Sequence, residues 1–323
     1  MKKILLSTFS LLCLGMVCNA LPTSSVLLQH KGNVVVYPLD SLNAALRDAV
    51  DDDTLFLSKG IFPGFTIDKK ITVRGAGQET ITNGQVLIAI PDSVTLTSTL
   101  LEGIRFQGST NSNGINVIKP VNNLKLKQCY VESLTCESVM HDVNIDRCYV
   151  SNELNIGNYV KSMKAVNSRI YRVRLASDSS KDITFINCNI LSFSEFENFN
   201  GTLLNSITGY GRTGSYVSLT SCSIINSLIC TYRLSIDTTC YQENCWTDDS
   251  DTKLVSDSWL GCKYSDDELI EKGYAGNNGS VIGSNGGTYP YTLELVVPKV
   301  QSSDLKLDNE NRKLNVNLIL TAE

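Results

Sequence analysis

Carboxylate and amide side chains occur at three places in this 323-residue sequence with spacings that acid–base chemistry uses. They are Asn144-Ile145-Asp146, Asp248-Asp249 and Asp266-Asp267. Two carboxyl groups on either side of a glycosidic bond can act as general acid and general base in its hydrolysis. Both Asp pairs follow the repetitive part of the chain, whereas Asn144 and Asp146 flank an inward Ile145. Because these groups do not converge, we assign no catalytic residue.

Metal-binding side chains are sparse. His30 and His141 are the only histidines, and no tight paired-cysteine frame accompanies them, so a zinc site is not expected. Calcium-assisted elimination would need several carboxylates around the ion and an Arg or Lys base, but only Asp146 has basic residues nearby. We therefore predict no metal and no cofactor, and we interpret His141 as a structural or solvated residue.

A basic and aromatic set of residues is more promising. Residues 119–174 hold nine Lys or Arg against five Asp or Glu, in a chain whose net charge is −5. An acidic polysaccharide could stack on the rings and pair its carboxylates with the cations, whereas the acidic chain as a whole argues against nucleic acid. The alternative is that Tyr and Arg stack on one another across neighbouring strands without a ligand. The candidate ligand-binding residues are Lys125, Lys127, Tyr130, Arg147, Tyr149, Lys164 and Arg169.

A repeated phrase must position these side chains. It reads aliphatic, any, aliphatic, two bend residues, a small or thiol residue, any, β-branched, and it returns every 17 to 28 residues. Its clearest copies begin at Leu124, Val143, Met163, Ile183 and Val217. Such a period with strand alternation indicates a solenoid, and leucine-rich repeats are excluded because their fixed Leu frame and helical half are missing.

Each copy predicts two short strands that meet at a bend. Because side chains alternate between the two faces of a strand, the two aliphatic residues both point inward. The two bend residues shift this alternation, so that the small residue after them points inward again. About eight coils at ~4.8 Å would make a rod roughly 40 Å long. The aligned small residues would form an internal ladder of Ala76, Ile104, Cys129, Cys148, Ser168, Cys188, Asn205 and Cys222.

This pattern resembles the right-handed parallel β-helix, or pectin-lyase-like, proteins, and the resemblance implies the handedness. Hydrolases of the polygalacturonase type on that fold use Asn-x-Asp, Asp-Asp, Gly-His-Gly and Arg-x-Lys motifs. This chain has no Gly-His and has Arg172-Val173-Arg174 in place of Arg-x-Lys, so the resemblance does not supply their active site.

The two ends of the rod are expected to be covered. Asp40-Ser41 offers an N-cap before an amphipathic helix over residues 42–50, which would cap the first coil. Asp266 to Gly273 reads as a short helix, and alternating residues after Tyr291 predict strands with a terminal hairpin. The tail 283–323 is similar to that of exported β-helix proteins of anaerobic Gram-negative gut bacteria. The expected organisation is a signal peptide (1–20), a capped β-helix (21–262) and a β segment that completes or caps it (263–323).

The N-terminus has the pattern of an export signal. Lys2 and Lys3 precede an apolar run, and Cys18-Asn19-Ala20 offers small residues for cleavage after Ala20. Lipid anchoring at Cys18 is the alternative, although Val17 occupies a position where a small residue is expected. The exported chain would lie in the periplasm, at the cell surface or outside the cell. No later apolar run is long enough to predict a membrane-spanning helix.

Nine cysteines would remain after cleavage, an odd number for an exported protein. We expect the four ladder cysteines to be buried thiols that pack as small hydrophobes. The pairing of the others stays open; they are Cys136, Cys230, Cys240, Cys245 and Cys262.

Three functions are compatible with these features. The leading hypothesis is an exported, non-catalytic β-helix of the cell envelope that binds a polysaccharide or another surface component around Tyr130 and Tyr149. The alternatives are a lyase or hydrolase acting on acidic glycans and a structural or adhesive rod.

Overall fold

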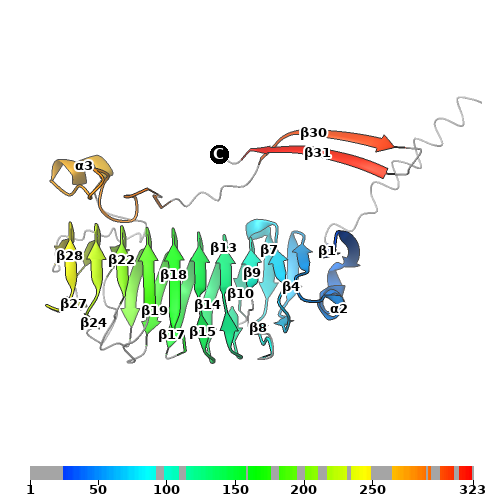
Figure 1. Ribbon diagram of the computed structural model, residues 1–323, viewed down its shortest axis with the longest axis horizontal. Helices are drawn as coiled ribbons and strands as arrows, with labels where there is room; N and C mark the ends of the chain where they lie inside the picture. The colour runs from blue at the N-terminus through cyan, green and yellow to red at the C-terminus, as the bar shows by residue number, and fades with distance from the viewer. Residues whose placement is uncertain are drawn as a thin grey trace, which may run out of the picture. The chain divides into compact units, whose positions relative to one another are not determined.

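The computed structural model describes residues 25–91, 98–108, 114–157, 159–175, 182–194, 201–209, 217–230, 234–248, 264–288, 290–291, 299–308 and 313–321. It confirms the predicted fold class: parallel strands stack as a right-handed β-helix of about eight turns (Figure 1). The chain divides into two compact units, residues 1–291 and 292–323. No helix in the described part of the chain is long and apolar enough to span a membrane.

Two long sheets form the walls of the rod. Within the described residues, sheet A runs in the order β2 (Asn33–Pro38), β1 (Ser25–His30), β3 (Thr54–Leu57), β6 (Thr72–Arg74), β9 (Thr99–Glu102), β13 (Leu124–Lys127), β16 (Val143–Asp146), β18 (Ser162–Val166), β20 (Asp182–Ile186), β22 (Thr202–Leu204), β25 (Ser223–Ile225) and β28 (Tyr241–Glu243). Its strands are parallel except that β1 is antiparallel to β2 and to β3.

Sheet B follows sheet A around each bend. Its main path is β29 (Trp246–Asp248), β26 (Leu228–Cys230), β23 (Ile207–Thr208), β21 (Asn189–Ser194), β19 (Arg169–Leu175), β17 (Tyr149–Gly157), β14 (Tyr130–Cys136), β10 (Arg105–Gln107), β7 (Thr80–Asn83) and β4 (Gly60–Pro63). Beside β14 the sheet continues through β11 (Ile115–Val117), β8 (Val86–Ile88) and β5 (Thr66–Ile67). Two short pairs complete the coils, β12 (Val121–Asn122) with β15 (Met140–His141) and β24 (Val217–Leu219) with β27 (Leu234–Ile236).

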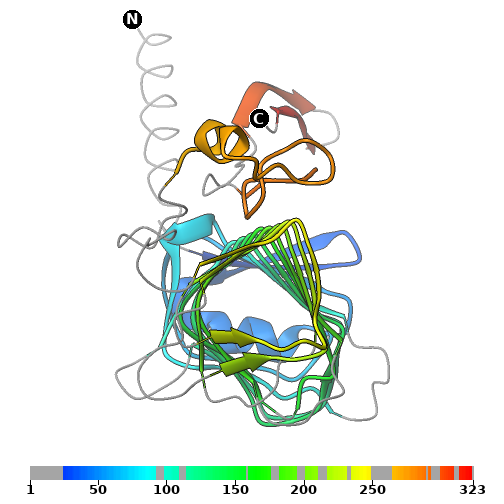
Figure 2. The ribbon, with the colours of Figure 1, turned by 90° about the vertical axis from the view of Figure 1, so that its left-hand side faces the viewer.

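The helix predicted near the N-terminus covers the first coil. Helix α2 (Leu42–Asp48), which follows a 3-10 turn over Leu39–Ser41, lies at the β1 end of the rod, and Figure 2 shows it across the loop of the coils. Its Leu42, Ala45 and Leu46 are buried in the main core. Ser41 occupies the N-cap position, but its hydroxyl bonds Asp40 and not the helix.

Seven ladder positions stack at the corner between the sheets, because the amide after each one bonds the carbonyl of the previous one. These bonds, from Tyr130 N to Ile104 O through Leu228 N to Ser206 O, measure 2.9–3.1 Å. The thiols and hydroxyls also donate to the carbonyl two residues earlier, as Cys188 Sγ does to Ile186 O at 3.3 Å and Ser206 Oγ to Leu204 O at 3.0 Å. The stacked residues are Ile104, Cys129, Cys148, Ser168, Cys188, Ser206 and Ser227.

Three predicted ladder residues lie elsewhere. Asn205 is the bend residue before Ser206, which takes the ladder position. Ala76 is exposed, and Thr80 takes the equivalent position in its coil, because the next residue, Ile81, pairs with Arg105. Cys222 stacks on Cys240 at another corner, since Tyr241 N donates to Cys222 O. The phrase beginning at Val217 misled the prediction because its first strand, β24, pairs with β27 outside the two long sheets.

The bends depend on left-handed backbone at one position in every coil. Gly103 has φ +64°, and the following coils place Gln128, Arg147, Asn167, Asn187, Asn205, Asn226 and Asn244 there with φ between +46° and +53°. Asn tolerates this conformation better than most residues because its short polar side chain can bond locally. A column of asparagines therefore runs along the corner of the later coils.

Helix α3 (Asp266–Glu271) and the loop after it pack on the later coils. Ser265 and Glu268 form a capping box, and Gly273 at φ +89° follows the helix, as predicted. Leu269, Val281 and Ile282 bury against Ile207 and Leu228 of sheet B. In the second unit, β30 (Lys299–Asp308) and β31 (Lys313–Thr321) form an antiparallel hairpin. Asn309 to Asn311 of the predicted turn lies outside the described residues.

Candidate ligand-binding face

Four outward residues of sheet B stack on neighbouring coils. Strand register pairs Arg105 with Tyr130, Tyr130 with Tyr149, and Tyr149 with Arg169. The two tyrosine rings meet edge to face at 5.3 Å. The guanidinium carbon of Arg105 lies 4.8 Å from the centre of the Tyr130 ring, and that of Arg169 lies 5.1 Å from the Tyr149 ring. We call these four residues the arginine–tyrosine column.

The column keeps hydrogen-bonding capacity despite its internal contacts. All four side chains are partly exposed. A guanidinium group stacks on a ring through its flat face, so its N–H groups, which lie in the guanidinium plane, can still donate hydrogen bonds to other groups. Arg105 Nε and, at the neighbouring corner, Arg147 Nε are buried and have no hydrogen-bond partner among the described residues. The exposed N–H groups of a guanidinium can donate two parallel hydrogen bonds to a carboxylate.

The same column of sheet B continues under residues 264–291, which we call the C-terminal segment. Register leads from Arg169 to Asn189, Ile207, Leu228 and Trp246. Trp246 stacks on Tyr274 with the ring centres 3.8 Å apart, so that part is covered by protein. Further along the segment, burial raises the pKa of Tyr291 to about 12, and the nearby Arg169 cation acts in the opposite direction. The segment therefore reaches the neighbourhood of Arg169 and Tyr149.

The predicted lysines lie on the other wall of the rod. Lys125 and Lys164 are exposed on sheet A, in one column with Asn144 between them. Arg147 sits at the corner between the two sheets, with φ +51°. The seven predicted residues thus extend around a corner: Tyr130, Tyr149 and Arg169 on sheet B, Lys125, Lys127 and Lys164 on sheet A, and Arg147 between them.

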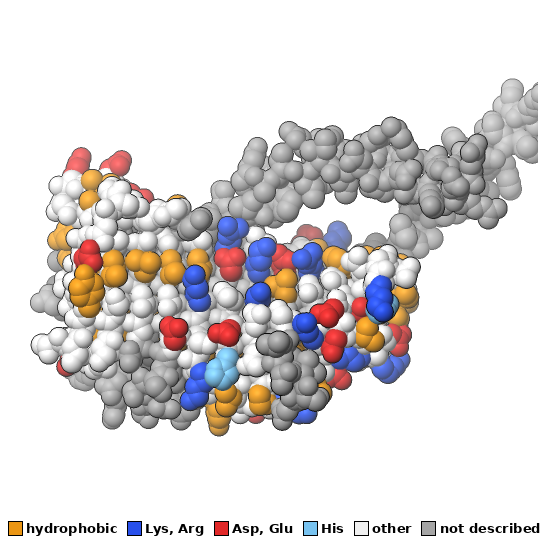
Figure 3. Space-filling model, in the orientation of Figure 1, with side chains coloured by type: hydrophobic (Ala, Val, Ile, Leu, Met, Phe, Trp, Pro, Cys, Tyr) orange, Lys and Arg blue, Asp and Glu red, His pale blue; other side chains and the backbone are white. Residues whose placement is uncertain are grey.

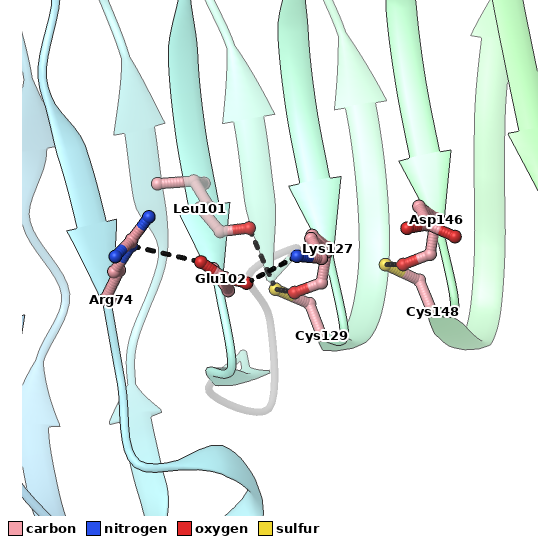
Figure 4. Close-up of polar contacts among 7 residues, drawn as sticks. All are labelled: Arg74, Leu101, Glu102, Lys127, Cys129, Asp146 and Cys148. Atoms are coloured by element: carbon pink, nitrogen blue, oxygen red, sulfur yellow. Dashed lines mark hydrogen bonds and ion pairs between the residues drawn. The ribbon is translucent and has the colours of Figure 1, made fainter. Parts of the chain in front are cut away.

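Lys127 differs from the other cations because it already forms an ion pair with a carboxylate of the protein. Its Nζ lies 3.0 Å from Glu102, which also pairs with Arg74 at 3.1 Å (Figure 4). Likewise Glu153 binds both Arg172 and Arg174. We call the arginine–tyrosine column together with the seven predicted residues the candidate face. Within the described residues, five of its cations form no ion pair, namely Arg105, Lys125, Arg147, Lys164 and Arg169. The face therefore carries uncompensated positive charge.

The carboxylates considered for catalysis are dispersed. Asp146 is in register with Lys127 and Val166, so no second carboxylate is its neighbour in that column. Asp266 and Asp267 form the first turn of α3, and Asp249 lies outside the described residues. No cluster of three or more His, Cys, Asp or Glu side chains suited to a metal ion occurs in the described part of the chain. His141 is exposed on β15.

An aliphatic column on sheet A was not predicted as a feature. Outward, partly exposed side chains of four successive coils stand in register, namely Val166, Ile186, Leu204 and Ile225. Figure 3 shows a row of hydrophobic side chains running along the rod and giving way to mixed charges. Their place before each bend asparagine is the sequence signal that identifies them.

Most of the cysteines after residue 20 are described and are free thiols. Among the described residues, Cys129, Cys136, Cys148, Cys188, Cys222, Cys240 and Cys245 are thiols and form no disulfide. Burial raises the pKa of Cys136 and Cys188 to about 12, and burial together with Cys129 raises that of Cys148. Cys262 and the side chain of Cys230 lie outside the described residues.

Comparison with known proteins adds no assignment: no protein-family model, no curated protein and no solved structure matches the chain.

Proposed function

We propose that this protein is an exported, non-catalytic β-helix of the cell envelope that binds an anionic polysaccharide along the arginine–tyrosine column and the adjoining corner. The observation that carries the proposal is the set of partly exposed guanidinium groups without carboxylate partners around two stacked tyrosines. The pattern of the first 20 residues supports export, and the resemblance to pectin-lyase-like proteins agrees with a glycan ligand without establishing it.

The geometry favours a polymer over a small anion. Arg105 and Arg169 are three coils apart, which corresponds to roughly 14 Å along the rod at ~4.8 Å per coil. A single carboxylate cannot reach both guanidinium groups, whereas a chain of acidic sugars running along the rod can present one carboxylate to each. The tyrosine edges between them offer apolar surface to the sugar rings.

Internal stacking of Tyr and Arg by itself would need no ligand, and it predicts a different response to mutation. Each charge-assisted hydrogen bond contributes about 1.5–3 kcal/mol, and partial exposure reduces this value. Loss of both Arg105 and Arg169 should therefore weaken binding of an acidic polymer by about tenfold or more. If the column is only structural, the same change alters stability and leaves any retention of polymer unchanged.

The experiment measures retention of the purified exported protein on polygalacturonate, dextran sulfate and uncharged dextran, together with the length of each polymer. The Arg105→Gln, Arg169→Gln double variant is compared with Lys119→Gln, a change of an exposed cation outside the face. The proposal predicts salt-sensitive retention on the acidic polymers that is weakened by about tenfold or more only in the double variant, with polymer length unchanged. Shortening of a polymer would instead indicate an enzyme, and an absence of retention would reject the binding function.

A further inference from the structure

In the described part of the chain, strand β2 forms the edge of sheet A at its N-terminal end. Within the described residues it pairs only with β1, and its sequence is Asn-Val-Val-Val-Tyr-Pro. Val34, Val35 and Val36 are 56%, 49% and 59% exposed. Exposed edge strands are usually blunted by charges, bulges or proline, because their free backbone groups pair with other chains. Three consecutive exposed valines on such an edge indicate a surface that another strand covers.

The opposite end of sheet A is protected in the usual way. There the terminal strand β28 carries Tyr241, Gln242 and Glu243. The Glu243 carboxylate accepts hydrogen bonds from Tyr241 Oη at 2.6 Å and from Asn277 Nδ2 at 2.8 Å. The apolar character of β2 is therefore specific to one end of the rod.

The hairpin fixes which backbone groups of β2 are free. Lys31 and Gly32 have φ +46° and +84°, the pattern of a two-residue type I′ turn, and His30 pairs with Asn33 across it. Hydrogen-bonded and non-bonded pairs alternate along an antiparallel ladder, so Asn33, Val35 and Tyr37 bond β1. The N–H and C=O groups of Val34 and Val36 consequently point to the free edge.

We propose that β2 pairs with β2 of a second copy of this chain in an antiparallel, two-fold symmetric dimer centred on Val35. In this register Val34 of each copy lies opposite Val36 of the other, which forms four backbone hydrogen bonds. The two Val35 side chains meet at the axis, where opposite residues without mutual hydrogen bonds bring their side chains closest. Pro38 has no N–H to donate, so the pairing ends there. A two-fold axis of this kind uses the same surface twice, as in most homodimers.

Charge at the two ends of the strand favours an antiparallel partner. Lys31 is exposed in the turn before β2, and Asp40 is exposed in the turn after it. With the axis at Val35, the turn that holds Lys31 in one copy approaches the turn that holds Asp40 in the other, and the symmetry repeats this contact. A parallel arrangement would instead place the two Lys31 side chains together. An extended segment of an unrelated protein would have no reason to match both charges and the position of Pro38.

Sedimentation velocity of the protein purified from the full-length sequence tests the dimer across a concentration series. The wild type is expected to sediment as a dimer, and Val35→Lys, which brings two cations together at the axis, is expected to raise the dissociation constant at least 100-fold. Ile270→Lys is the matched control, because Ile270 is 41% exposed on α3. A monomeric wild type, or a dimer that persists in Val35→Lys, would overturn the proposal.

Cysteine cross-linking tests the register without relying on disruption. Val35→Cys should form a disulfide-linked dimer on mild oxidation, because the two Cα atoms fall within the range of 4.4–6.8 Å that a disulfide spans. Val36→Cys should not, because in this register residue 36 faces residue 34 of the second copy. Cross-linking of Val36→Cys at the same rate, or no cross-linking of Val35→Cys, would reject the register. Exchange of the charges in Lys31→Asp, Asp40→Lys should keep the dimer, whereas Asp40→Lys alone should weaken it.

Discussion

The contact between the C-terminal segment and the rod makes a quantitative prediction at Asn187. Its side chain is 1% exposed, and its amide donates to two carbonyls of the segment, Ser284 O at 3.0 Å and Gly286 O. Asn187→Ala leaves both acceptors buried without that donor, which costs about 1–3 kcal/mol for each. The sum, about 2–4 kcal/mol after partial relaxation, should loosen residues 274–287 and not the whole rod, because solenoid coils depend mainly on their neighbours.

Asn167 provides the matched control for this change. It occupies the same bend one coil earlier with φ +47°, against +52° for Asn187, and its Oδ1 has no hydrogen-bond partner in the described residues. Asn167→Ala therefore introduces the same unfavourable left-handed alanine without removing a contact to the segment. The difference between the two variants isolates the two hydrogen bonds.

Hydrogen exchange followed by mass spectrometry reads out the result. Amides of the segment, such as Gly283 N on Asn226 O at 2.7 Å, should lose about 30-fold to 1,000-fold in protection in Asn187→Ala. Rod amides such as Leu228 N should change little. Equal loss of protection in the Asn187 and Asn167 variants would refute the assignment of these bonds as the anchor of the segment.

Three further predictions follow from single contacts. Glu102→Gln releases Lys127 and should strengthen retention on acidic polymers, while the urea midpoint shifts by no more than the equivalent of about 1 kcal/mol for each exposed ion pair; unchanged retention would show that Lys127 takes no part. Phe185→Ala empties a fully buried core site and should cost about 3–5 kcal/mol in urea unfolding, whereas a loss below 1 kcal/mol would contradict its central packing. Because burial raises the thiol pKa of Cys136 and Cys188 to about 12, the unfolded chain releases those protons first as the pH rises, so stability should fall between about pH 9 and pH 12. Urea midpoints across that range check the sign, and a rise with pH would contradict it.

The fold could be read from the sequence because the inward positions repeat. Leu126, Ile145, Ala165 and Phe185 are in register on successive strands, as the repeated phrase requires. The prediction was wrong where one coil contains two aliphatic pairs, at Val217 and at Ile224. Spacing alone does not say which of the two pairs enters the long sheet. The sequence analysis also interpreted the ladder thiols as small hydrophobes, whereas each donates a hydrogen bond to the carbonyl group on the other side of the bend.

The candidate face was less predictable, because its character depends on pairing between coils. Lys127 looked equivalent to Lys125 in sequence, and only the position of Glu102 on the neighbouring coil neutralises it. The C-terminal segment covers the later part of the same column through contacts nearly 100 residues apart, which no local pattern encodes.

The most direct test of the proposed function is the affinity of the purified protein for polygalacturonate as a function of salt, for the wild type and for the Arg105→Gln, Arg169→Gln variant. We expect wild-type binding that weakens as salt rises, a loss of about tenfold or more in the variant, and a polymer of unchanged length. Equal affinity of the two proteins, or shortening of the polymer by the wild type, would contradict a non-catalytic polysaccharide-binding face at the arginine–tyrosine column.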